Sequence, residues 1–144
     1  MGTILHLSLP AADLAETRRF YVDVLGCAPG RQRPGWFDVW FHGLQLTFHE
    51  EPDQVTPPER AGARHFGVTL PMAELDPLLA RLDAAGVRWV RTARTDEPGT
   101  PREQRKAKLA DPSGNVIELK SYADPVAALE IPEGAGVADG GAVS

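Results

Sequence analysis

Two similar stretches of the sequence decide the fold. The first is His6-Leu7-Ser8-Leu9-Pro10, and the second, about sixty residues later, is His65-Phe66-Gly67-Val68-Thr69-Leu70-Pro71. In both, large apolar residues alternate with smaller or polar ones, which predicts a β-strand with one apolar face. The histidine lies on the other face in both copies. We expect each strand to end at its proline, because proline cannot donate a ladder hydrogen bond.

The residues after each stretch repeat the same order of elements. Apolar residues at helical spacing follow both strands, most regularly at residues 75–82, and a glycine closes each helix. Strand-like segments come next, at 36–41 and 44–48 in the first copy and at 87–90, 105–109 and 116–119 in the second. The chain is therefore predicted to be α+β, with two tandem βαβββ modules.

The predicted modules cover residues 1–50 and 64–122. Residues 51–63 contain three prolines and are expected to link the modules. Residues 123–144 are rich in alanine, glycine and proline, and we expect them to form a C-terminal tail.

Composition excludes several classes of function. The chain has 144 residues and a net charge of -5, which argues against a general nucleic-acid binder. Its single cysteine, Cys27, excludes an intrachain disulfide and a cysteine-rich zinc site. The sequence has no apolar run near the ~18 residues that a membrane span needs, and its first residues do not resemble a signal peptide. We expect a cytoplasmic protein with a small-molecule substrate and no nucleic-acid or membrane partner.

Charge is nevertheless uneven along the chain. Residues 81–108 hold eight basic and four acidic side chains, while the rest of the chain is strongly acidic. This segment is either a solvated surface loop or a basic rim that attracts an anionic substrate.

The repeat places four polar residues at matched positions. His6 corresponds to His65, and Gln45 corresponds to Glu118. If a pseudo-twofold axis relates the modules, these side chains converge on one point. Two histidines and one carboxylate with open coordination positions are typical of non-haem Fe(II) oxygenases and of other divalent-metal sites. The matched positions favour a metal site over two unrelated structural histidines.

These residues resemble the vicinal oxygen chelate superfamily of glyoxalase I, fosfomycin-resistance transferases, bleomycin-resistance proteins and type I extradiol dioxygenases. The similarity lies in four motifs: His6-x-x-x-Pro10, Phe20-Tyr21-x-x-Val24-Leu25-Gly26, His65-Phe66-Gly67-Val68 and Asp111-Pro112-Ser113-Gly114-Asn115-x-x-Glu118. The resemblance implies that the paired modules form a half-open, cup-shaped mixed β-barrel with the helices outside. It also implies that His6, His65 and Glu118 are the metal ligands, and that the protein is a homodimer.

Within the superfamily, Gln45-Leu46-x-x-His49 and Arg102-Glu103-Gln104 most resemble small bacterial proteins described as extradiol-dioxygenase-like. This likeness makes Fe(II) the expected cofactor, with Mn, Ni or Zn as alternatives. It departs from glyoxalase I, which generally has a glutamate where this chain has Gln45. The sequence also departs from established extradiol dioxygenases, which carry a further catalytic histidine and a tyrosine that this chain lacks at the corresponding positions.

Gln45 and His49 are the candidate catalytic residues. Four residues apart on one strand, they share a face, so His49 is either an acid–base group near the metal or an exposed residue beside Glu50 and Glu51. Aromatic residues at 36–41 belong mainly to the core, and those on the Gln45 side are candidates for a substrate wall.

Three functions follow from this reading. The first is a divalent-metal enzyme of the dioxygenase type that acts on a small substrate with neighbouring oxygens. The second is a metal-dependent isomerase or a resistance transferase of the glyoxalase or fosfomycin type. The third is a metal-free binding protein that sequesters a drug, against which the retention of all three candidate ligands argues.

Overall fold

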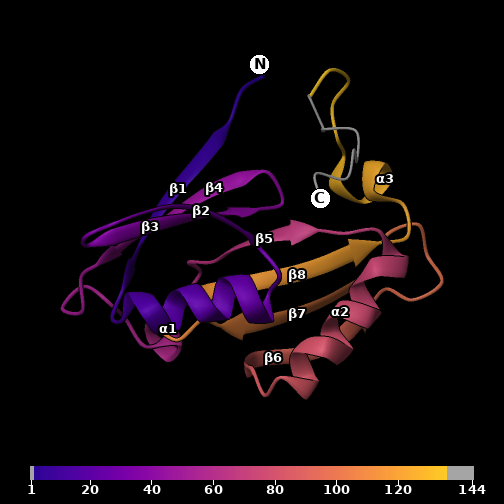
Figure 1. Cartoon of the computed structure of the whole chain (residues 1–144). Helices are drawn as coiled ribbons and strands as arrows, with labels where there is room; N and C mark the ends of the chain where they lie inside the picture. The colour runs from indigo at the N-terminus through magenta and orange to yellow at the C-terminus, as the bar shows by residue number, and fades with distance from the viewer. Residues whose placement is uncertain (1, 136–144) are drawn as a thin grey trace. The chain divides into compact units, whose positions relative to one another are not determined.

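Both predicted opening strands are present in the computed structural model, which describes residues 2–135 (Figure 1). They are β1 (Leu5–Ala11) and β5 (Phe66–Thr69). β1 pairs in parallel with β4 (Leu44–Glu50), and β5 pairs in parallel with β8 (Val116–Tyr122). The sequence repeat is therefore a structural repeat.

Each opening strand belongs to a separate four-stranded sheet. The strand orders are β1-β4-β3-β2 and β5-β8-β7-β6. The remaining strands are β2 (Ala28–Arg33), β3 (Trp36–Phe41), β6 (Arg88–Asp96) and β7 (Gln104–Ala110). The predicted α+β class with two such modules is confirmed. Within residues 2–135 the strands form these two open sheets and no closed barrel.

The predicted helices are also present. In α2 (Met72–Ala84), Leu75, Leu79 and Leu82 are buried, as the apolar spacing indicated. The first helical segment is divided into α1 (Leu14–Arg19) and a π-helix, η1 (Phe20–Val24). A π-turn has more residues per turn than an α-helix. This explains why the apolar spacing of the first copy is less regular.

The end of β1 differs from the prediction. Pro10 does not end the strand, which continues to Ala11 and keeps Pro10 opposite His49. β1 lies at the edge of its sheet, where a missing N–H costs no ladder hydrogen bond. The second opening strand does end before its proline, because Pro71 is the N-cap residue of α2.

One face of the first sheet forms an apolar core with the helical segment that follows β1. Phe37 and Phe48 stack with ring centroids 5.3 Å apart, and the ring of Tyr21 lies 4.5 Å from that of Phe48. Val39 and Leu46, from the same face, are fully buried. Because side chains alternate along a strand, the other face of this sheet carries the polar residues of β1, β3 and β4.

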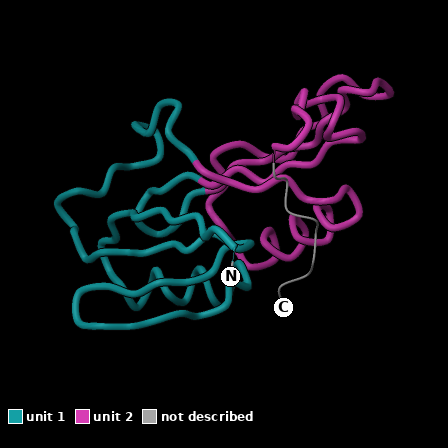
Figure 2. The backbone as a smooth tube through the Cα atoms, turned by 90° about the horizontal axis from the view of Figure 1, so that it is seen from above, with its two compact units in different colours: residues 1–65, 110–116, 144 teal, residues 66–109, 117–143 magenta. Residues whose placement is uncertain are grey.

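The chain divides into two compact units that interrupt each other in sequence (Figure 2). Unit 1 comprises residues 2–65 and 110–116, and unit 2 comprises residues 66–109 and 117–135 within the described range. Residues 110–116 join β7 to β8, so a loop of the second repeat packs in unit 1. Residues 51–63 contain a short 3₁₀-helix, η2 (Pro58–Arg60).

Hydrogen bonds of the 110–116 loop with η1, with β1 and with Ala12 explain this packing. Asp111, on the loop, accepts from the hydroxyl of Tyr21 at 2.8 Å. Asn115 Nδ2 donates to the carbonyl of Pro10 at 3.1 Å, and Ser113 Oγ accepts from the N–H of Ala12 at 2.9 Å. Burial raises the pKa of Asp111, and the hydrogen bonds that it accepts only partly offset that rise.

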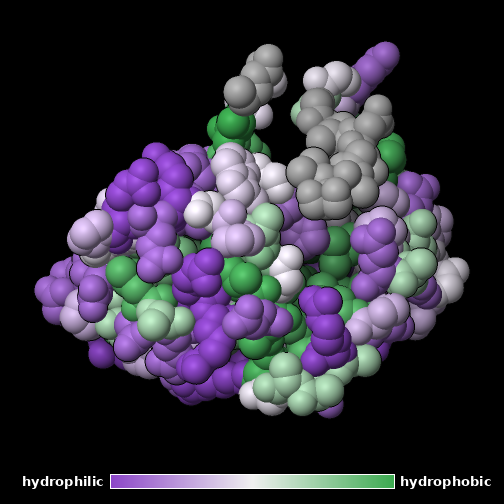
Figure 3. Space-filling view, in the orientation of Figure 1, coloured by the Kyte–Doolittle hydropathy of each residue, from purple (hydrophilic) through white to green (hydrophobic). Residues whose placement is uncertain are grey.

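The expected tail contains a short helix, α3 (Pro125–Leu129), which Asp124 caps. Residues 136–144 of that expected tail lie outside the described residues. No helix in residues 2–135 is long and apolar enough to cross a membrane. Hydrophilic and hydrophobic residues are interspersed on the surface in Figure 3.

Candidate functional site

The polar face of the first sheet is the candidate site. In the β1–β4 register His6 lies opposite Gln45, and Pro10 lies opposite His49. In the β3–β4 register Asp38 lies opposite Thr47. Opposed residues point to the same side of a sheet, so all of these side chains share one surface. We call it the polar face; it comprises His6, Ser8, Trp36, Asp38, Trp40, Gln45, Thr47 and His49.

At the centre of the polar face, Asp38 is a buried carboxylate bound by Arg31. The guanidinium donates to Asp38 Oδ2 from Nε at 2.9 Å and from Nη2 at 2.7 Å. The backbone N–H of Arg31 donates to Oδ1 at 2.6 Å. Burial alone would raise the pKa of Asp38, but hydrogen bonds from Arg31 and Gln45 outweigh it, and the pKa lies below its ordinary value. Asp38 is therefore a charged group at neutral pH.

Glycine at position 30 makes this arrangement possible. Side chains have no room there, because a Cβ would overlap the carboxylate of Asp38. β2 carries a register shift between Pro29 and Gln32, so two residues, Gly30 and Arg31, lie across from Asp38 alone. The bulge brings the side chain of Arg31 onto Asp38.

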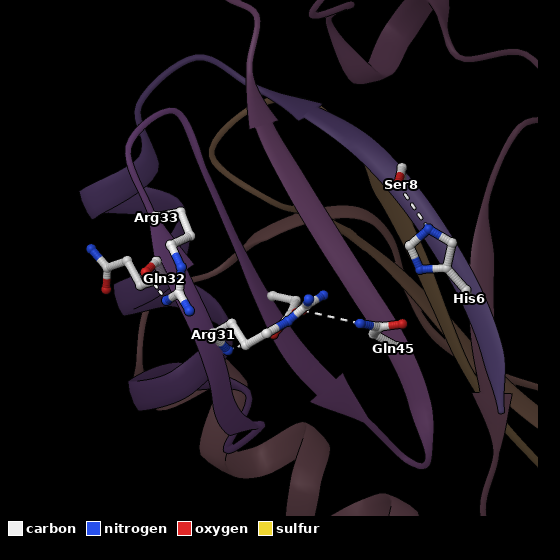
Figure 4. A network of polar contacts seen from close by, with 7 residues as sticks. His6, Ser8, Arg31, Gln32, Arg33 and Gln45 are labelled. Atoms are coloured by element: carbon white, nitrogen blue, oxygen red, sulfur yellow. Dashed lines mark hydrogen bonds and ion pairs between the residues drawn. The ribbon is translucent and has the colours of Figure 1, made fainter.

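The amide of Gln45 has a defined orientation. Its Nε2 donates to Asp38 Oδ2 at 3.0 Å. An ionised carboxylate only accepts hydrogen bonds, so the NH₂ group must face Asp38. The amide oxygen then points away from Asp38, toward the strand that carries His6 (Figure 4). The polar face thus presents a fixed hydrogen-bond acceptor beside that histidine.

Thr47 lies beside this network and has an unsatisfied hydroxyl. Its residue is 5% exposed, and its Oγ1 has no hydrogen-bond partner within residues 2–135. A buried polar group without a partner costs about 1–3 kcal/mol. Such violations of the ordinary rules are expected mainly at functional sites.

The two candidate histidine ligands have local partners. His6 is exposed, and its Nε2 lies 3.2 Å from Ser8 Oγ. His65 directly precedes β5, and its Nδ1 lies 2.9 Å from the carbonyl oxygen of Ala63. A carbonyl oxygen only accepts, so Nδ1 is the donor, and in the neutral tautomer Nε2 has the lone pair. Metal-binding histidines commonly have this arrangement.

Glu118, the third candidate ligand, is on β8. It lies opposite Gly67 of β5, and a Cβ at residue 67 would overlap the backbone carbonyl oxygen of Glu118. Its side chain is 14% exposed and lies 4.0 Å from the ammonium of Lys120. Gly67 therefore allows the close approach of strands that positions Glu118.

The structure brings some predicted site residues together. His6 and Gln45 are neighbours, and His49 shares their face at the exposed end of β4. Within residues 2–135, no three side chains of histidine, cysteine, aspartate or glutamate gather closely enough to hold a metal. The three-ligand set of His6, His65 and Glu118, like the catalytic roles of Gln45 and His49, stays a prediction.

Other sequence features have structural roles. Cys27 is buried, and burial raises the pKa of its thiol to about 12, which does not favour a nucleophilic thiolate. In the basic segment, Arg105 pairs with Asp76 at 2.6 Å and Lys106 with Asp96 at 2.8 Å. These ion pairs reduce the positive charge that segment could offer to an anionic substrate.

Sequence reasoning missed the Arg31–Asp38 pair. The available signal was Asp38 itself, an acidic residue within the aromatic strand Trp36–Phe41. Within that strand Phe37 and Phe41 are buried in the core, whereas Trp40 is 37% exposed. Trp36 and Trp40 are thus the aromatic residues that line the polar face.

Comparison with known proteins agrees with this architecture. The model of the Glyoxalase/Bleomycin resistance protein/Dioxygenase superfamily matches residues 3–119. The chain belongs to this superfamily. A crystal structure of a glyoxalase/bleomycin resistance protein/dioxygenase from Alicyclobacillus acidocaldarius is 32% identical, with a TM-score of 0.76; the match covers 85% of this chain and 92% of that one.

Two further similarities involve fosfomycin-resistance proteins. The glutathione transferase FosA of Serratia marcescens is 27% identical over 124 residues, which make up 79% of this chain and 77% of that protein. The crystal structure of the fosfomycin resistance protein FosX from Listeria monocytogenes has a TM-score of 0.68 at 20% identity; the match covers 84% of this chain and 93% of that one. The second similarity concerns the fold alone.

Proposed function

We propose that this chain is a divalent-metal-dependent enzyme whose small substrate lies on the polar face of unit 1. The observation that carries the proposal is the polar face itself, where a buried, charged Asp38 orients the Gln45 amide beside His6. Buried charge and an unsatisfied hydroxyl are costly in a purely structural sheet. Membership of the superfamily supports an enzyme.

Three residues, His6, His65 and Glu118, would hold the metal. Two imidazoles and one carboxylate suit Fe(II), Mn, Ni or Zn, and the hydrogen bond from His65 Nδ1 to Ala63 fits an Nε2 ligand. A bound metal ion would supply Lewis acidity toward substrate oxygens. Gln45 would accept a hydrogen bond from the substrate through its amide oxygen, and His49 would exchange a proton at the edge of the face.

Two reaction classes share these requirements. Oxygenation with Fe(II) follows from the sequence likeness to extradiol-dioxygenase-like proteins. Transfer of a thiol to a small electrophile is favoured by the similarity to the glutathione transferase FosA. The two differ in co-substrate, since the first consumes O2 and the second consumes a thiol.

Metal analysis tests the proposed function first. Protein purified without oxygen or chelator is expected to hold about one metal ion per chain, by mass spectrometry. Glu118→Gln is expected to weaken metal affinity at least about tenfold, because even residues that only support a ligand cost 10–100-fold. Glu74→Gln, an exposed position on α2, is the matched control. Wild-type protein that neither contains nor takes up metal would contradict the proposal and favour a binding protein.

The bound metal then directs the assay for activity. Fe(II) leads to an oxygen-uptake screen with catechols. Mn, Ni or Zn leads to assays of glutathione consumption with fosfomycin and to isomerase assays. Light scattering on the same sample tests the homodimer that the family resemblance implies.

A further inference from the structure

Arg31 is held in one orientation on the polar face. Asp38 accepts hydrogen bonds from its Nε and Nη2, and the guanidinium carbon lies 4.9 Å from the centroid of the Trp36 ring. Figure 4 shows the side chain extending from β2 across the sheet toward Gln45. A guanidinium fixed on one edge by a carboxylate and on one face by an aromatic ring loses little further entropy when it binds a ligand.

The opposite edge of this guanidinium can bind a ligand. Asp38 contacts Nε and Nη2, and in the described part of the chain Nη1 makes no hydrogen bond or ion pair. The Arg31 side chain is 58% exposed. Nη1 and the second hydrogen of Nη2 form a planar pair of donors, which matches two oxygens of a carboxylate, phosphate or phosphonate.

The backbone contact to Asp38 does not require an arginine at position 31. The backbone N–H of Arg31 already donates to Asp38 Oδ1 at 2.6 Å, and any residue except proline could make that bond. Gln45 supplies a further hydrogen bond to the same carboxylate. The guanidinium adds an oriented, accessible cation to a face that otherwise presents aromatic rings, histidines and an amide.

We propose that Arg31 is a binding residue for an oxyanionic group of the substrate, a carboxylate or a phosphonate. This inference rests on the proposed function in placing the substrate on the polar face. It narrows the substrate to small molecules that carry one such anionic group, held end-on by Nη1 and Nη2 of Arg31. Trp36 and Gln45 flank that position.

Titration with two simple anions tests the inference. Methylphosphonate and benzoate are added separately to the ¹⁵N-labelled full chain at low salt and followed by NMR. The Nε–Hε signal of Arg31 reports contact in the wild type, and the indole N–H signal of Trp36, which every binding variant retains, reports affinity in all of them. Affinity in the millimolar range is expected, since a single exposed charged contact is worth little. The relative affinity of the two probes distinguishes a phosphonate from a carboxylate site.

Variants of neighbouring arginines provide the comparison. Arg31→Gln is expected to weaken binding of the preferred probe at least about tenfold, and Arg31→Lys is expected to weaken it because lysine has no planar pair of donors. Arg33→Gln is the matched control, since exposed Arg33 lies on the same strand and, within residues 2–135, its guanidinium donates only to the carbonyl of Gln32. It should change affinity less than twofold. An equal loss in Arg31→Gln and Arg33→Gln, or no shift of the Arg31 signal with either probe, would overturn the inference.

Two further variants separate folding and metal effects. Arg31→Gln leaves Asp38 without its cation, so Arg31→Gln/Asp38→Asn provides a neutral pair if the single variant unfolds; loss of binding is expected in both. Glu118→Gln removes a proposed metal ligand. If Glu118→Gln still binds the anion, the result supports Arg31 as the binding residue. If Glu118→Gln loses anion binding and Arg31→Gln keeps it, the result contradicts this inference but not the proposed metal-dependent function. Unchanged metal content in Glu118→Gln contradicts the proposed function alone.

Discussion

Asp38 carries a negative charge that is almost completely buried, in contrast to most aspartates. Four donors, three of them on Arg31 and one on Gln45, hold that charge in place. Because these bonds lower its pKa, the carboxylate binds a proton less tightly in the folded protein than in the unfolded chain. Its contribution to stability is therefore present above the unfolded pKa, about 3.9, and is lost as pH falls through the folded value.

This linkage predicts the behaviour of Asp38→Asn. At neutral pH the variant is expected to be less stable by about 1.5–3 kcal/mol, the usual worth of hydrogen bonds to a charged group. The difference should narrow as pH falls below about 4, where the wild type loses the same contribution. Urea unfolding at a series of pH values measures both effects. Asp53→Asn, in the exposed 51–63 segment, should follow the wild type; a constant difference at all pH values would contradict the argument.

Tyr21 of η1 is hydrogen-bonded to the 110–116 loop. Its hydroxyl is fully buried and donates to Asp111, whose pKa burial raises. Tyr21→Phe keeps the ring stacked on Phe48 but removes this donor. We expect a loss of about 1–3 kcal/mol, because a buried acceptor loses a partner. Thermal unfolding compared with Tyr122→Phe, on β8, is the test, and equal melting temperatures would refute it.

At the scale of the element, the pairing of β5 with β8 depends on a glycine. A Cβ at residue 67 overlaps a backbone carbonyl oxygen, which cannot rotate away as a side chain can. Gly67→Ala is therefore expected to separate the strands and to cost at least about 3 kcal/mol, as severe overpacking does. Gly62→Ala controls for backbone strain alone: its φ is +61° in open space, and about 1–2 kcal/mol is expected.

Chemical denaturation and metal titration of the two glycine variants distinguish the causes. If the strand contact positions Glu118, Gly67→Ala should also weaken metal binding, while Gly62→Ala should not. Equal stabilities of the two variants would show that the contact of residue 67 with the Glu118 carbonyl oxygen costs no more than the backbone strain at residue 62.

The elements also show where sequence reasoning succeeds. Strands β1, β3, β4, β5 and β8 could be predicted, because their alternation or apolar content reflects one buried face. β2 could not, since its six residues are all exposed and include proline and glycine. The register of β2 with β3 shifts directly before Arg31: counted from Pro29 opposite Val39, regular alternation would place Arg31 opposite Phe37, on the apolar side. A pair created by an irregularity in a polar strand leaves no periodic signal in the sequence.

For the whole molecule, folding depends on the order in which the segments of the two units follow each other in the chain. Unit 1 is completed only by residues 110–116, which come after most of unit 2 in the chain. Closing such a long loop costs entropy that the contacts of Asp111, Ser113 and Asn115 must offset. Unit 1 therefore cannot be fully formed until residues 110–116, which follow residues 66–109 of unit 2, have packed in it.

Interleaving of this kind predicts one cooperative unfolding transition. Trp36 and Trp40 report on unit 1, and Trp89 reports on unit 2. Trp89→Phe leaves the two tryptophans of unit 1, and Trp36→Phe/Trp40→Phe leaves the tryptophan of unit 2. In each variant, the urea midpoint from fluorescence should equal the midpoint from circular dichroism. Adding Tyr21→Phe to either background should shift both probes together, although the lost hydrogen bond lies in unit 1. A shift confined to the Trp36 and Trp40 signal would show that the two units unfold independently.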